Sequence, residues 1–78
     1  MKVYVAKYTT KHDDYICVFT TAERANKWRQ DIAEEWWGDE FSGQKAPDDP
    51  EKKADEYFEK MMEYGDEFFT IEEHEVIE

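Results

Sequence analysis

Cysteine is almost absent from this chain: Cys17 is the only one, so an internal disulfide is excluded. The apolar residues on both sides of Cys17 predict a buried, inert thiol, as is typical of a reducing cytoplasm. The sequence also lacks an apolar run long enough to span a membrane, and no signal-peptide pattern opens it. We therefore expect a soluble, cytoplasmic protein.

Motifs for catalysis and metal binding are lacking as well. On a strand, His74 and Glu72 would share a face, but two ligands are fewer than the three or four that zinc usually needs. We expect instead an edge strand that charge protects against mispairing. The other histidine, His12, falls in the polar turn of residues 9–14, with no nucleophile placed beside it. We predict no catalytic residue, no metal site and no cofactor, and therefore no enzyme.

Basic residues are few: the chain has 10 against 21 acidic residues, a net charge of −11. The charge is also unevenly distributed along the chain. Residues 1–30 carry six bases and three acids, a net of +3, whereas residues 31–78 carry four bases and 18 acids, a net of −14. Such a field repels nucleic acid and acidic membranes and favours basic surfaces. The simpler alternative is a solvated face that keeps the protein in solution.

The length of 78 residues predicts one domain spanning residues 1–78. A single core of that size is only marginally sufficient. Aromatic residues make up 17% of the chain, and this compensates, because each buried ring removes a large apolar area from water.

The clearest predicted element is an amphipathic helix from Thr20 to Gly38. We expect Thr20 to cap it, with Glu23 completing a capping box, and Gly38 to end it in the left-handed conformation. Spacings of three, four and four place its apolar residues on one side. These residues are Ala25, Trp28, Ile32 and Trp36.

Three strands are predicted from alternating, β-forming sequence. Residues 2–8 and 15–19 form a hairpin, and apolar residues on both of its faces indicate that each face is at least partly covered. Residues 67–77 form the last strand, whose alternation slips near Glu72–His74 and predicts a bulge or an edge there.

A second helix follows the glycine- and proline-containing loop 38–49. Asp48 or Asp49 is expected to cap it, Pro50 to occupy its first position, and Gly65 to end it. The element order is therefore β-β-α-α-β. We predict an α+β fold, with a three-stranded, mainly antiparallel sheet and two helices on one face. The first strand is expected in the centre of the sheet.

Three segments carry a resemblance to known proteins: VYVAKY near the start, YICVFTTAERA after it, and FFTIEEHEVI at the end. They resemble a family of very small uncharacterised proteins of phages and bacteria, over about residues 1–33 and 66–78. The resemblance implies a ββαβ core and a phage or mobile-element setting, and it brings no catalytic residues. Residues 34–65 depart from the pattern. By type, the chain is also similar to small acidic phage inhibitors of the anti-CRISPR and anti-restriction classes.

Trp36 and Trp37 are adjacent, and neighbouring helical residues point about 100° apart, so one apolar stripe does not bury both. The stripe favours Trp36. Trp37, with Phe41, would then lie on the surface among acids and resemble a protein-binding hot spot. The alternative is that Trp37 packs locally over the loop of residues 38–47.

Nine carboxylates follow one loop and one helix: Asp48, Asp49, Glu51, Asp55, Glu56, Glu59, Glu63, Asp66 and Glu67. Helix neighbours one turn apart lie about 5–6 Å apart, comparable to successive phosphates along a nucleic-acid strand. A ridge of this kind can occupy a groove that normally binds DNA or RNA. The predicted partner-binding residues are Glu34, Glu35, Trp37, Asp39, Glu40, Phe41, Asp48, Asp49, Asp55, Glu56, Glu59 and Glu63.

The function that these features predict is inhibition by charge mimicry. We expect a phage-type inhibitor in the host cytoplasm, a monomer or weak homodimer that contacts neither nucleic acid nor membrane. It would bind a basic surface on a host or phage protein. The alternative is an accessory protein-interaction module without mimicry. Binding that depends strongly on salt would distinguish the first from the second.

Overall fold

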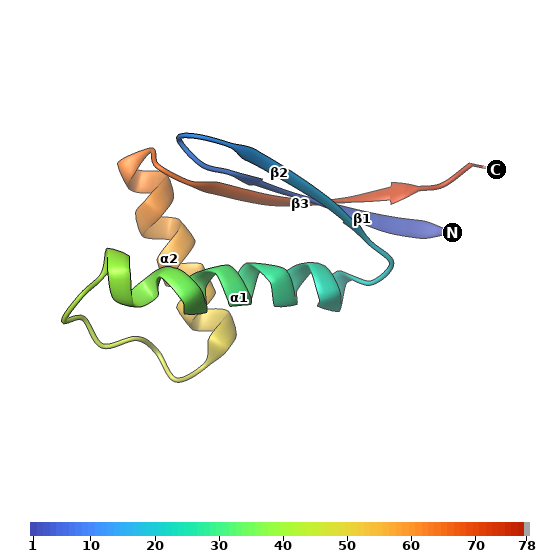
Figure 1. Ribbon diagram of the computed structural model, residues 1–78. Helices are drawn as coiled ribbons and strands as arrows, with labels where there is room; N and C mark the ends of the chain where they lie inside the picture. Colours follow the sequence, from blue (N-terminus) through green and yellow to red (C-terminus); the bar gives the residue numbers. More distant parts are fainter. Residues whose placement is uncertain (78) are drawn as a thin grey trace.

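The computed structural model describes residues 1–77 and has the α+β fold and the element order predicted above (Figure 1). Its elements are β1 (Lys2–Thr9), β2 (Asp14–Phe19), α1 (Ala22–Glu40), α2 (Pro50–Tyr64) and β3 (Phe68–Glu75). No helix among the described residues is both long and apolar enough to cross a membrane.

The sheet has the order β2-β1-β3, which confirms the central position of the first strand, and both strand pairs are antiparallel. The β1–β3 register is unbroken from Lys2–Glu75 to Thr9–Phe68, so of the two alternatives predicted near Glu72–His74 the bulge is wrong. The edge is confirmed, because β3 lies at one edge of the sheet. The sequence alternation slips there for another reason. This end of the sheet extends past the start of α1, and the side chains of residues 72–75 are exposed on both faces (Figure 1).

Both helices lie on one side of the sheet (Figure 1), where they bury Ala6 and Tyr8 of β1. The opposite face is open, and Ile16 and Val18 of β2 are each 62% exposed on it. The expectation that both faces are partly covered is therefore wrong for β2. Cys17 points to the helix side but is only half-buried, because β2 is an edge strand. The predicted fully buried thiol is corrected accordingly.

Helix α1 begins one residue later and ends later than predicted. Its N-cap is Thr21, whose Oγ1 accepts a hydrogen bond from the Arg24 N–H at 3.2 Å, and Glu23 is then too close to the cap to form the capping box. The helix continues through Gly38 to Glu40 and ends at Phe41. Glycine only weakens a helix interior, and burial of the following Phe41 outweighs that cost.

Helix α2 has the ends that its sequence predicts. Asp49 is the N-cap and accepts from the Glu51 N–H at 2.9 Å, and Pro50 occupies the first turn. Gly65 ends the helix with φ 75°, in the left-handed region, and donates its N–H to the Met62 carbonyl at 3.0 Å.

The core lies where α1, α2 and the hairpin end of the sheet meet. Aromatic rings dominate it and contact one another mostly edge to face, the arrangement that ring quadrupoles favour. The buried cluster consists of Tyr8, Ile32, Ala33, Trp37, Phe41, Ala54, Tyr57, Phe58 and Met61, with Trp28, Ala46 and Phe69 packed against it.

Candidate acidic surface and aromatic cleft

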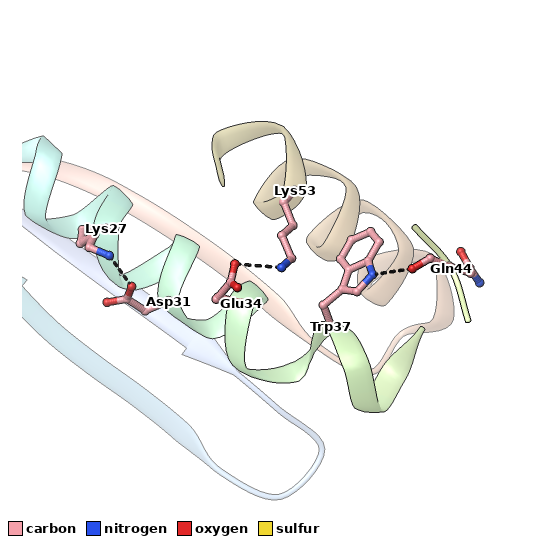
Figure 2. Close-up of polar contacts among 6 residues, drawn as sticks. All are labelled: Lys27, Asp31, Glu34, Trp37, Gln44 and Lys53. Carbon is pink, nitrogen blue, oxygen red and sulfur yellow. Dashed lines mark hydrogen bonds and ion pairs between the residues drawn. The ribbon is translucent and has the colours of Figure 1, made fainter. Parts of the chain in front are cut away.

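The apolar anchor predicted for a partner is in fact part of the core. Trp37 is 6% exposed and Phe41 is 3% exposed, and their rings meet at 4.9 Å. The Trp37 indole Nε1–H donates to the Gln44 carbonyl at 3.2 Å, as Figure 2 shows, so Trp37 holds the loop that follows α1. Lys60 lies 5.8 Å from the Trp37 ring centre and covers it from outside. The local-packing alternative is therefore correct for Trp37.

Trp37 is buried in place of Trp36 because α1 packs against two different elements, the sheet and α2. Trp28 of α1 packs against the sheet, with its ring 5.3 Å from that of Phe69. Further along, α1 packs against α2, and this contact selects the side that carries Ala33 and Trp37. Trp36 is then left 41% exposed. The sequence prediction assumed one buried side along the whole helix, and it therefore missed that the buried side changes where α1 leaves the sheet and meets α2.

Three of the predicted acidic contact residues are used within the fold. The Glu34 carboxylate pairs with the Lys53 ammonium at 2.8 Å, between α1 and α2 (Figure 2). Asp55 pairs with Arg29 at 2.8 Å across the same helix pair. Asp49 is the N-cap of α2. These side chains join or cap the helices, so we remove them from the centre of the candidate surface.

The other seven predicted carboxylates are exposed, and none of them forms an ion pair within residues 1–77. They are Glu35, Asp39, Glu40, Asp48, Glu56, Glu59 and Glu63. Acidic side chains in this state keep their full charge available to a partner.

These carboxylates do not all lie in one hollow of the surface. Glu56 and Glu59 of α2 line a shallow depression together with Lys52 and Pro47. Glu35 and Glu40 of α1 line a different and larger cleft against the β-hairpin. The sequence predicted a ridge along residues 48–67 and, separately, acids around an exposed Trp37, among them Glu35 and Glu40. Because Trp37 is buried, Glu35 and Glu40 instead line a cleft between α1 and the hairpin. The structure therefore has an α2 surface, which carries the ridge, and a separate α1 cleft.

The α1 cleft has a volume of about 430 Å³ and opens between the second half of α1 and the β1–β2 hairpin. Four aromatic side chains, Tyr8, Tyr15, Trp28 and Trp36, form much of its wall. Tyr8 and Tyr15 stack with ring centres 5.9 Å apart, and Trp28 meets Tyr8 edge-on at 6.3 Å. Packing thus holds the inner rings in place before any ligand arrives.

Glu67 also lines this cleft, although the sequence prediction counted it among the carboxylates of the ridge. It is only 8% exposed and accepts hydrogen bonds from the hydroxyls of Tyr8 and Tyr57, the latter at 2.9 Å. Burial, and after it the hydrogen bond to Glu67, raises the pKa of both tyrosines above the ordinary value. A buried tyrosine hydroxyl needs a hydrogen-bond acceptor, so two tyrosines at core positions could have predicted a buried acceptor such as Glu67.

The His74 pair stands alone on the open face of β3. His74 Nε2 lies 3.1 Å from Glu72 Oε2, and this hydrogen bond, with a smaller contribution from Lys7, lowers the pKa of Glu72. Within residues 1–77 no group of three or more histidine, cysteine, aspartate or glutamate side chains is placed to hold a metal ion.

We compared the chain with protein-family models, curated proteins and solved structures. None of them matches.

Proposed function

We propose that this protein is a non-catalytic inhibitor that covers a basic, nucleic-acid-binding surface of a partner protein. The resemblance of its first and last segments to small phage and bacterial proteins supports a host-defence target, of the kind met by anti-CRISPR and anti-restriction proteins. The partner binds the acidic surface in place of DNA or RNA, and no bond is made or broken.

The exposed row of carboxylates on α2 carries this proposal. Glu56, Glu59 and Glu63 lie three and four residues apart on one helix and are exposed. Among the described residues, neither Lys53 nor Lys60 forms an ion pair with them: Lys53 pairs with Glu34 at 2.8 Å, and the Lys60 ammonium donates to Gln44 Oε1 at 2.9 Å. The remaining field is strongly negative and accelerates encounter with a basic surface.

The test is a charge reversal on this surface. Partners are first captured from bacterial lysate at low and at high salt and then purified, and their association and dissociation rates are measured. The variant Glu56→Lys/Glu59→Lys/Glu63→Lys should fold, since all three side chains face water. It should abolish binding, first by slowing association and then by repulsion. Duplex DNA should compete with the wild-type chain for the partner.

A matched control makes the same change of total charge elsewhere. Asp13→Lys/Asp14→Lys/Glu23→Lys alters exposed side chains that form no ion pair within residues 1–77. This control should still bind, with a smaller loss of association rate. Wild-type kinetics for the α2 variant, or equal losses for both variants, would rule out the α2 surface as the contact.

The open face of the sheet favours a second candidate, an accessory interaction module without mimicry. Ile16 and Val18 are 62% exposed on it, and Phe68 of β3 is 41% exposed. Exposed apolar groups of this kind are typical of protein contacts. Binding through this face would be nearly independent of salt, and Ile16→Ser/Val18→Ser would abolish it while the α2 reversal would not.

A further inference from the structure

The α1 cleft combines two features that together select an organic cation. Four aromatic side chains form much of its wall, and the face of an aromatic ring attracts positive charge. Its polar lining includes three carboxylates, from Glu35, Glu40 and Glu67, together with the Thr10 hydroxyl and the His12 imidazole. Neither lysine nor arginine is among the described residues that line it, so carboxylates outnumber the single basic side chain by three to one. A neutral apolar ligand would leave these carboxylates desolvated, and an anion would be repelled.

Glu67 gives the cleft a negative charge that the fold itself does not neutralise. Its carboxylate is 92% buried, and its partners are two neutral tyrosine hydroxyls; no ion pair involves it within residues 1–77. A buried charge acts through a low dielectric and is screened less than an exposed one.

The neighbourhood of the cleft already shows a preference for positive charge. Lys11, in the hairpin loop, has its ammonium 2.8 Å from Asp66, which raises the pKa of Lys11, and Glu40 adds to that rise from the cleft. Lys11 is held by Asp66 and is not among the residues that line the cleft. The cleft therefore remains available to a cation from outside the chain.

We propose that the α1 cleft binds an arginine side chain presented by the basic partner, so this inference rests on the proposed function. A guanidinium is planar, stacks on aromatic rings and pairs with carboxylates through several N–H groups. Trp36, 41% exposed on α1, stacks on the guanidinium, and Glu35 and Glu40 accept its hydrogen bonds. Trp36 thereby takes the role of apolar anchor that the sequence assigned to Trp37.

The experiment uses the full chain labelled with ¹⁵N and the blocked amino acid N-acetyl-arginine-N-methylamide as the probe. The indole N–H signals of Trp36 and Trp28 should shift on titration, with a Kd of about 1–10 mM, as expected for a single side chain. The indole of Trp37 donates to Gln44, lies outside the cleft and should not shift. The matched probe is blocked citrulline, which has nearly the same shape without the charge and should produce no shift.

Variants separate the contribution of the carboxylates to arginine binding from that of the Trp36 ring. Glu35→Gln/Glu40→Gln should weaken arginine binding about fivefold or more, and Trp36→Ala about two- to fivefold. Glu56→Gln/Glu59→Gln, on the α2 surface, is the control and should leave the Kd unchanged. The unshifted Trp37 indole signal reports that each variant is folded.

Equal shifts with blocked arginine and blocked citrulline, or no shift of Trp36 and Trp28, would overturn the cleft inference. The two proposals fail separately. If blocked arginine binds but the α2 charge reversal leaves partner binding intact, the cleft stands and mimicry by α2 falls. If the reversal abolishes partner binding but the cleft ignores blocked arginine, mimicry stands and the cleft inference falls.

Discussion

Replacing Glu67 by leucine should have opposite effects in two backgrounds. In the wild-type chain, Glu67 accepts hydrogen bonds from Tyr8 and Tyr57, and Tyr57 is fully buried. Glu67→Leu therefore leaves two hydroxyls in the core without an acceptor. In a Tyr8→Phe/Tyr57→Phe background those hydroxyls are gone, and Glu67 becomes a buried carboxylate without a partner. There, Glu67→Leu removes the unfavourable charge.

The magnitudes follow from burial and charge. Each hydroxyl left without an acceptor costs about 1–3 kcal/mol, so the two together should lower the free energy of unfolding of Glu67→Leu by about 2–6 kcal/mol. Part of this loss is offset because the variant no longer buries a carboxylate. Tyr57→Phe alone loses one hydrogen bond to a charged acceptor and should cost about 1.5–3 kcal/mol. In the double-phenylalanine background, Glu67→Leu should raise the free energy of unfolding by about 1 kcal/mol or more.

Urea denaturation followed by tryptophan fluorescence measures all of these free energies, provided that the m-values stay equal. Glu59→Leu is the control for adding a leucine to the surface, and it should change stability by less than about 0.5 kcal/mol. Suppose that Glu67→Leu has the same cost in both backgrounds, within about 0.5 kcal/mol. The three side chains would then not act as a unit, and the reasoning above would be refuted.

Three further predictions test other parts of the fold. Trp37→Ala should cost about 3–5 kcal/mol and Trp36→Ala less than about 1 kcal/mol in urea denaturation, and equal costs would contradict the burial of Trp37. Gly38→Ala should raise the melting temperature and increase the free energy of unfolding by up to about 1 kcal/mol, because Gly38 lies inside α1 with open space around it. Gly65→Ala should lower the melting temperature, because Gly65 has φ 75°, which alanine adopts only at a cost. Because the pKa of Tyr57 is raised in the fold, the folded state keeps a proton that the unfolded state loses, and stability should fall by up to about 1.4 kcal/mol per pH unit above about pH 10. Urea midpoints between about pH 9 and 11 measure this, and the loss should shrink in Tyr57→Phe.

The candidate site was predictable in composition but not in arrangement. The sequence identifies which residues are acidic, and seven of the ten predicted carboxylates are exposed and unpaired among the described residues. It does not reveal that Glu34 and Asp55 find Lys53 and Arg29, because those pairs join different helices. The aromatic cleft was missed for the same reason: its wall comes from β1, β2 and α1 together.

The sequence by itself determines the local structure of this protein. Alternation identifies all three strands, and Asp49, Pro50 and Gly65 mark both ends of α2, because these signals depend on neighbours within one turn. Tertiary packing alone decided which side of α1 is buried, where α1 ends, and that Glu67 is enclosed. Those outcomes depend on which surface meets each helix, and a helix with two neighbours is free to bury Trp37 in place of Trp36.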